Sequence, residues 1–179
     1  NIHPYSEYQL RLLDVKRSCR LLGIELIEGE YDTEGWLEAV RGLENEPEKG
    51  ARCSVCFDNR FEVTAKKAHE LGEKIFTSTL LTSPKKSLTQ LKNSGDYLAD
   101  KYNLAFIAPD YRSKQGTQEQ NILAKQDKLY RQDYCGCLFG LTKQREYQDK
   151  LTDELFCPIS KQTQPESIED RLHMYEKRW

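Results

Sequence analysis

Six cysteines are the residues of this chain whose type and spacing could do chemistry, and four of them form two short pairs. Cys53 and Cys56 stand three residues apart, which at the start of a helix places both thiols on one face within one turn. Cys135 and Cys137 flank Gly136, whose backbone freedom would let both sulfurs point to one ligand. Thiolates that converge from two such motifs suit zinc or an iron-sulfur cluster. The spacing therefore predicts a metal site and leaves its metal open.

Plainer explanations of these pairs are also open. A C-x-x-C motif can be a thioredoxin-like redox pair or two unrelated buried thiols, and C-x-C is not the usual second half of a zinc ribbon. The two other cysteines lack paired spacing. Cys19 lies on an apolar helical stripe, where a small core residue is expected, and Cys157 has no partner in sequence. Only the paired cysteines enter the metal-site hypothesis.

Composition limits the class of protein. The chain has 179 residues, of which 37% are hydrophobic and 31% charged, enough for one packed domain. A net charge of −2 means that an RNA partner would need a local basic patch rather than a global positive field. No apolar run is long enough for a membrane span, so we expect a soluble, cytoplasmic protein. The chain begins at Asn1 without a methionine, and we expect a strand to precede it.

The elements that must position the cysteines follow from the hydrophobic spacing. Ser6 can cap a first helix that Gly23 ends, and further helices are expected at residues 33–43, 53–71, 117–129 and 167–179. A helical stretch over 88–102 is expected to be interrupted around Ser94 and Gly95. Strands are expected at 24–27, 75–80 and 104–108. Strands that alternate with helices predict an α/β fold with a parallel sheet flanked by helices.

Loops at the carboxyl ends of the strands would form the site in such a fold. Asp32, Ser83 and Asp110 lie on these loops. Asp32 could be a helix cap, a metal ligand or a proton donor, and taken alone the cap is favoured. A local basic patch could form from residues of two loops, namely Lys85, Lys86, Arg112 and Lys114. Arg60, one turn after Cys56, could bind a phosphate or pair with a neighbouring carboxylate.

Several motifs, taken together in order and spacing, carry a family resemblance. They are N-I-H-P at residues 1–4, E-Y-D at 30–32, R-C-x-x-C at 52–56, F-T-S-T-L-L-x-S-P at 76–84 and L-Y-R-Q-D-Y-C-G-C at 129–137. Over about residues 1–141 the chain resembles the QueH family of epoxyqueuosine reductases. Any one of these motifs would be weak, whereas their combination is highly specific.

The resemblance implies a cobalamin-independent reductase that converts epoxyqueuosine to queuosine in tRNA. It implies a HUP-like or Rossmann-like sheet, an iron-sulfur cluster (4Fe-4S), a second mononuclear metal (iron or zinc), and an external electron donor. The family's domain would cover residues 1–142, without its first strand and the adjacent cysteines that end it, and residues 143–179 would form a polar, partly helical extension. A disulfide bond is a further expected feature.

Matching positions give the expected metal ligands and Asp32, and the other site residues are expected from their place in the chain, since the loop near Lys114 departs from the family's pattern. The metal ligands would be Cys53, Cys56, Cys135 and Cys137. The catalytic residues would be Asp32, as a ligand of the second metal or a proton donor, and Tyr134, which could donate a hydrogen bond or stack on the base. The substrate-binding residues would be Arg52, Arg60, Lys86 and Lys114. Removal of the epoxide oxygen takes two electrons and two protons, and the oxygen leaves as water.

Two other classes of function are open from the residues alone. The first is an RNA-binding protein without catalysis, in which the four cysteines hold structural zinc. The second is a thiol-disulfide oxidoreductase. Zinc would leave the protein colourless, an iron-sulfur centre would make it brown, and a redox pair would need no metal.

Overall fold

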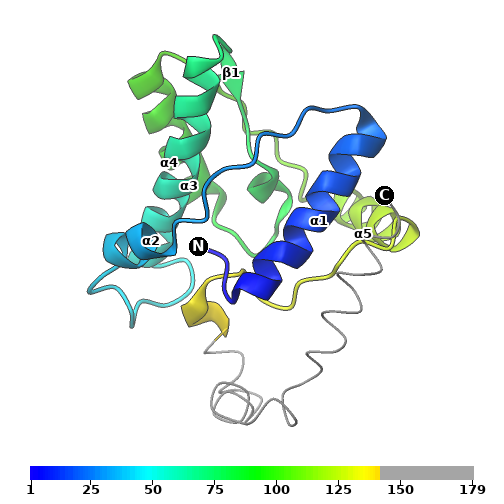
Figure 1. Ribbon diagram of the computed structural model, residues 1–179, viewed down its shortest axis with the longest axis horizontal. Coiled ribbons are helices and arrows are strands. Elements are labelled where there is room, and N and C mark those ends of the chain that lie inside the picture. The colour runs from blue at the N-terminus through cyan, green and yellow to red at the C-terminus, as the bar shows by residue number, and fades with distance from the viewer. Residues whose placement is uncertain (142–179) are drawn as a thin grey trace. The chain divides into compact units, whose positions relative to one another are not determined.

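The computed structural model describes residues 1–141, which divide into two compact units. The central unit comprises Tyr31–Asp127. The split unit comprises Asn1–Glu30 together with the chain from Lys128 onward, of which residues 128–141 are described. Figure 1 colours the two parts of the split unit blue and yellow. The predicted extension at 143–179, with its amphipathic helix and Cys157, lies outside the described residues.

The split unit is built on α1, Tyr5–Leu22. As predicted, Gly23 ends this helix, and its left-handed φ of 65° is one that glycine adopts at little cost. The predicted cap at Ser6 is wrong, because Pro4 precedes the helix and its carbonyl accepts the backbone N–H groups of Glu7 and Tyr8. Proline suits this place, since its fixed φ is compatible with a helix start.

The strand predicted at residues 24–27 is absent from the described part of the chain. This segment has no regular structure, and Ile24 and Ile27 are exposed. β-prone residues form a strand only where another strand offers hydrogen bonds and packing. Within residues 1–141 the sheet has only two strands, and both belong to the central unit.

The central unit has a parallel pair of strands covered by helices. The strands are β1, Ile75–Phe76, and β2, Ala105–Phe106. The helices are α2 (Thr33–Ala39), α3 (Ala51–Glu70), the 3-10 helix η1 (Thr79–Thr82), α4 (Leu88–Tyr102) and α5 (Lys114–Gln126). Helices α3 and α4 pack side by side (Figure 1). The α/β class is confirmed in this coarse form.

An apolar core holds the central unit together. Aromatic rings from α3 and both strands meet in it, because Phe61 lies 6.4 Å from Phe76 and 5.4 Å from Phe106 between ring centroids. Buried aliphatic residues surround them, including Ala65, Leu81, Leu91, Leu98 and Ala99. Burial of each large side chain contributes roughly 1.5–3 kcal/mol. The core thus fixes α3, the helix that carries one cysteine pair.

Helix α4 is continuous, so the predicted interruption around Ser94 and Gly95 is wrong. Both residues are buried, and Gly95 faces Phe106 of β2. A Cβ added to Gly95 would lie 2.1 Å from Cδ1 of Phe106, so the glycine permits close packing instead of breaking the helix. Tertiary contact therefore outweighs the low helix propensity of glycine.

The predicted strands shorten where side chains redirect the backbone. Strand 75–80 is reduced to β1 because the hydroxyl of Ser78 accepts the N–H of Leu80 and begins η1. Strand 104–108 is reduced to β2. The helix predicted at 117–129 begins earlier, since the hydroxyl of Ser113 accepts the N–H of Gly116.

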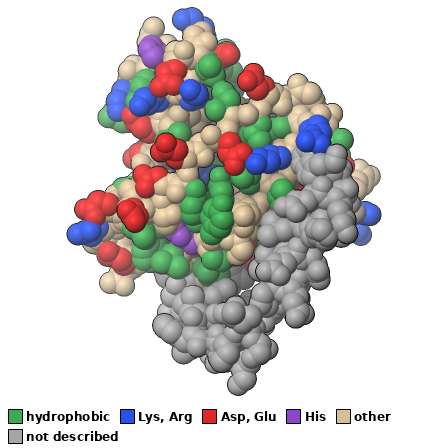
Figure 2. All heavy atoms as spheres, in the orientation of Figure 1, with side chains coloured by type: hydrophobic (Ala, Val, Ile, Leu, Met, Phe, Trp, Pro, Cys, Tyr) green, Lys and Arg blue, Asp and Glu red, His purple; other side chains and the backbone are tan. Residues whose placement is uncertain are grey.

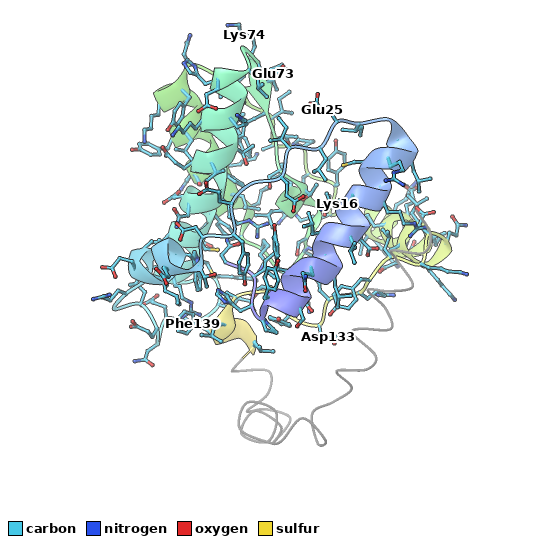
Figure 3. The ribbon with its side chains drawn as sticks, viewed as in Figure 1. Lys16, Glu25, Glu73, Lys74, Asp133 and Phe139 are labelled. Atoms are coloured by element: carbon cyan, nitrogen blue, oxygen red, sulfur yellow. The ribbon has the colours of Figure 1, made fainter. Side chains whose placement is uncertain are left out.

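The surface mixes both signs of charge. Figure 2 shows Lys and Arg side chains interspersed with Asp and Glu on the visible face. In Figure 3, Glu73 and Lys74 stand together in the turn between α3 and β1. None of the helices in residues 1–141 has both the length and the apolar character needed to cross a membrane.

Candidate metal centre

The C-x-C motif of the split unit forms a tight loop. It lies between Asp133 and Phe139, both labelled in Figure 3. Gly136 has a φ of 111°, which L side chains rarely adopt, and this conformation lets the flanking side chains converge. The Sγ atoms of Cys135 and Cys137 lie 3.5 Å apart. As the spacing predicted, the two sulfurs are presented together.

The loop has the chemistry and the space that a thiolate-bound metal needs. Two thiolates at about 2.3 Å from a tetrahedral metal would be roughly 3.7 Å apart, close to the separation seen here. The N–H of Gly140 donates to Sγ of Cys137 at 3.2 Å, which favours negative charge on that sulfur. A Cβ at Gly140 would lie 3.0 Å from Sγ of Cys135 and 3.4 Å from Sγ of Cys137, so the glycine keeps the space beside both sulfurs open.

A largely buried ion pair on α1 contacts this loop through its arginine. Arg11 donates to the carbonyl of Cys135 at 3.1 Å and to that of Tyr134 at 3.2 Å. Oε1 of Glu7 accepts from Nε of Arg11 at 2.9 Å, and the same oxygen forms an ion pair with Nη2 at 2.8 Å. The two side chains are only 8% (Glu7) and 16% (Arg11) exposed. The carboxylate therefore orients the guanidinium toward the loop.

Tyrosines complete this network. The hydroxyl of Tyr130 donates to Glu7 at 2.6 Å, and burial, followed by that bond, raises the pKa of Tyr130 above its ordinary value. Tyr130 thus stays protonated as a donor at neutral pH. The hydroxyl of Tyr134, predicted to act in catalysis, donates to the carbonyl of His3, while the N–H of His3 donates to the carbonyl of Gly136 at 2.7 Å. Tyr134 is partly buried, and its catalytic role stays a prediction.

The C-x-x-C motif of the central unit lies in the first turns of α3, as predicted. Cys53 is the third residue of this helix and Cys56 follows at i+3, so the helix itself places both on one face. The N–H of Lys49 donates to Sγ of Cys53 at 3.3 Å. Both thiols are partly buried.

Two side chains hold the loop that leads into α3. Arg52 is 3% exposed, and its Nη1 donates to the carbonyls of Leu43 and Glu44, each at 2.9 Å. Gln90 of α4 donates to the carbonyl of Lys49 at 2.9 Å and to the hydroxyl of Ser54 at 2.8 Å. Arg52 was predicted to bind substrate. Its observed bonds give it a structural role, and the contact with substrate remains untested.

The two cysteine pairs belong to different units. Within the described residues, no group of three or more His, Cys, Asp and Glu side chains is arranged to hold a metal ion. No disulfide joins the five cysteines of residues 1–141, so the expected disulfide bond is not found there. A centre with four cysteines stays a prediction.

Asp32 caps α2, as its position suggested. Its Oδ1 accepts the N–H of Gly35 at 2.8 Å, and the side chain is exposed. A Cβ at Gly35 would lie 2.2 Å from Oδ2, so the glycine leaves room for the capping carboxylate. The cap and a further role as ligand or proton donor are compatible, because an exposed carboxylate has lone pairs to spare.

The loops after β1 and β2 lie together, as expected for parallel strands. The hydroxyl of Thr77 donates to the carbonyl of Ile107 at 2.6 Å, and Nη1 of Arg112 donates to the carbonyl of Lys86 at 3.1 Å. Arg112 also binds Asp110 at 2.8 Å, and this hydrogen bond holds the pKa of Asp110 below its ordinary value.

Carboxylates partly neutralise the predicted basic patch. Lys86 pairs with Glu48 at 3.2 Å, and Arg112 pairs with Asp110. Lys85 and Lys114 are exposed, and Arg60 is partly exposed on α3. Substrate binding by Arg60, Lys86 and Lys114 stays a prediction.

The residues that sequence reasoning left without a role are those that surround the C-x-C loop, namely Glu7, Arg11, Tyr130 and Gly140. The i, i+4 spacing of Glu7 and Arg11 on a predicted helix could have indicated their ion pair. Nothing in the sequence indicated that the arginine would bind carbonyls more than 120 residues away, at separations of 123 and 124.

Fold and site together define a mixed α/β protein with two cysteine pairs, in one of which the two sulfurs lie 3.5 Å apart. The family model described as epoxyqueuosine reductase QueH matches residues 1–143. The chain belongs to the QueH family, and the resemblance inferred from its motifs is confirmed.

Relatives in several bacteria support this membership. An epoxyqueuosine reductase QueH of Helicobacter pylori is 48% identical over 98% of this chain, and one of Histophilus somni is 37% identical over 83%. One of Thermotoga maritima is 36% identical over 85%. The chain spans 49% of the Helicobacter pylori protein, 62% of the Histophilus somni protein and 81% of the Thermotoga maritima protein.

Proposed function

We propose that this chain forms part of an epoxyqueuosine reductase that acts on tRNA of the queuosine family. The observation that carries the proposal is the family match over residues 1–143, which includes both cysteine pairs. In the reaction, both C–O bonds of the epoxide break and a C=C bond forms. Two electrons come from an external donor, and two protons leave with the oxygen as water.

The four paired cysteines would hold an iron-sulfur cluster and a second metal. The Cys135–Cys137 geometry supports thiolate ligation, since the sulfurs converge beside the open space at Gly140. The cluster would supply electrons, and the second metal would polarise the epoxide C–O bond.

Other residues of the chain would bind and orient the substrate. The carboxylate of Asp32, exposed at the start of α2, could deliver a proton or ligate the second metal. Arg60, Lys86 and Lys114 would contact tRNA phosphates, and Tyr134 would contact the modified base. A HUP-like sheet, of which β1 and β2 would form one parallel pair, would carry the loops that lead to Lys86 and Lys114.

Anaerobic purification of the complete gene product, followed by iron, zinc and sulfide analysis, tests the cofactors. Conversion of epoxyqueuosine-containing tRNA, measured by nucleoside mass spectrometry with a chemical reductant, tests the activity. Cys135→Ser and Cys56→Ser should abolish conversion and lower the iron content. Cys19→Ser serves as the matched control, because Cys19 lies on α1 outside both motifs.

The same measurements separate the rival functions. A colourless, zinc-only protein that binds tRNA and converts none of it would replace the reductase with a structural-zinc protein. Metal-free protein that exchanges thiols and disulfides would point to an oxidoreductase of another kind.

A further inference from the structure

We propose that Glu7 and Arg11 are positioning residues, which hold the backbone of the C-x-C loop so that the thiols of Cys135 and Cys137 can bind one metal together. The inference rests on the proposed function, in which these thiols are metal ligands. It assigns a role to two side chains that the metal-site hypothesis does not include among its ligands.

The guanidinium of Arg11 points toward the backbone of the C-x-C loop. Its Nη1 and Nη2 donate to two successive carbonyls, those of Cys135 and Tyr134. A planar fork that binds two consecutive peptide groups fixes both the position and the tilt of the backbone. The Cα of Gly136 lies against the same fork, because a Cβ there would be 2.9 Å from Nη1 of Arg11.

Glu7 fixes the orientation of the Arg11 side chain. Oε1 of Glu7 accepts the Nε–H of Arg11 and pairs with Nη2, while Oε2 accepts the hydroxyl of Tyr130. Both carboxylate oxygens are thus engaged, and the side chain has little freedom to rotate. The N–H of Tyr130 is held in turn by the carboxylate of Asp14.

The largely buried ion pair of Glu7 and Arg11 serves to select one arrangement of the chain. Such a pair contributes little net stability compared with apolar residues of the same volume, and its best-attested use is to select one arrangement. The arrangement selected is the loop that carries the two sulfurs. In metal sites, outer groups that orient the ligands typically change metal affinity by 10- to 100-fold.

Phenylarsine oxide provides a probe that needs neither tRNA nor turnover. It condenses with two neighbouring thiols, forming two As–S bonds while its oxygen leaves as water. The full 179-residue chain, reduced and freed of metal, would be treated with this reagent, and capture at each cysteine pair would be timed by peptide mass spectrometry. The Cys53–Cys56 pair in the same molecule serves as the internal control.

Two variants test the geometry. Arg11→Lys keeps the charge but loses the fork, and Glu7→Gln with Arg11→Gln leaves no lone buried charge. In each, capture at Cys135–Cys137 should slow roughly 10-fold or more, with capture at Cys53–Cys56 unchanged. Arg20→Met, an exposed arginine on the same helix, should change neither.

If the rate of capture at Cys135–Cys137 in the double variant is within about twofold of wild type, the proposal is overturned. If Arg11→Lys captures the reagent at the wild-type rate, the charge of residue 11 is sufficient, and the role assigned to the fork geometry is overturned. If the single variant does not fold, judged by loss of a cooperative thermal transition, the double variant decides by the same criterion. A loss of capture confined to Cys135–Cys137 would support the positioning role even if the complete protein converts no epoxyqueuosine. The positioning role and the reductase function can therefore fail independently.

Discussion

The two units of the molecule place their cysteines by different means. In the central unit an apolar core fixes α3, and the helix alone sets the relation between Cys53 and Cys56. In the split unit the apolar residues buried within residues 1–30 and 128–141 are few, chiefly Leu10 and Leu141. Hydrogen bonds that Arg11 donates hold its loop instead, and Glu7 accepts from both Arg11 and Tyr130.

The difference shows what each arrangement depends on. A pair on a helix keeps its geometry as long as the helix exists, because one turn determines the spacing. A pair on a loop depends on every donor and acceptor that fixes the loop, since hydrogen bonds are directional while apolar packing is not. We therefore expect the C-x-C pair to respond to substitutions far from it in sequence, and the C-x-x-C pair to tolerate them.

The largest expected effect concerns a residue placed, like Cys53, at a helix start. Asp32→Asn should leave stability nearly unchanged, because Asn caps a helix about as well as Asp. If Asp32 also ligates metal or passes a proton, single-turnover conversion of epoxyqueuosine in tRNA should fall by roughly 100-fold. The complete gene product, with its metal content verified, is the protein to assay. Wild-type turnover would leave Asp32 as a cap alone.

The next largest effect is expected at Gly136, in the C-x-C loop of the split unit. Gly136→Ala should lower the free energy of unfolding of the split unit by about 2–3 kcal/mol, because its φ of 111° is strained for alanine and the new Cβ would meet Arg11. Arsenical capture at Cys135–Cys137 should slow as well. Urea unfolding with hydrogen exchange read separately for each unit measures the first quantity.

Gly23→Ala is the matched control for that substitution. Gly23 also has a positive φ, of 65°, but nothing lies within 4 Å of an added Cβ. It should cost about 1 kcal/mol and leave thiol capture intact. Equal losses of capture in both variants would mean that general destabilisation, not loop geometry, controls the pair.

The smallest expected effect on thiol geometry concerns the Cys53–Cys56 pair on α3, when Arg52 before it is replaced. Arg52→Met removes the donors to the carbonyls of Leu43 and Glu44 and should destabilise the central unit by about 2 kcal/mol. Because both thiols stay on α3, capture at Cys53–Cys56 should remain within about twofold of wild type. A 10-fold loss would show that this pair, too, depends on the loop before it.

Local sequence patterns predicted much of the fold, and tertiary contacts explain the failures. Helix spacing and the stop at Gly23 were confirmed, since they depend on neighbours within a few residues. The strand at 24–27 and the break at Gly95 were wrong because each depends on a partner elsewhere in the chain. For Gly95 that partner is the ring of Phe106, which sequence periodicity does not reveal.

The same division applies to the candidate site. Short motifs predicted the placement of Cys53 and Cys56 on one helix, the convergence of Cys135 and Cys137, and the cap at Asp32. The partners of Arg11 could not be predicted, because hydrogen bonds between residues more than 100 positions apart leave no local pattern. Ligation, catalysis and substrate contact remain predictions, since each involves a molecule other than this chain.

The division of the chain also implies an order of events during translation. Residues 31–127 are contiguous, so the central unit can fold as soon as it leaves the ribosome, with Cys53 and Cys56 already aligned on α3. Helix α1 is synthesised earlier, but Arg11 gains its carbonyls only when residues 134 and 135 emerge, about 123 positions later. At 5–20 residues per second this interval lasts roughly 6–25 seconds. The C-x-x-C thiols are thus aligned first, and the C-x-C loop gains its hydrogen bonds from Arg11 only after residues 134 and 135 have been synthesised.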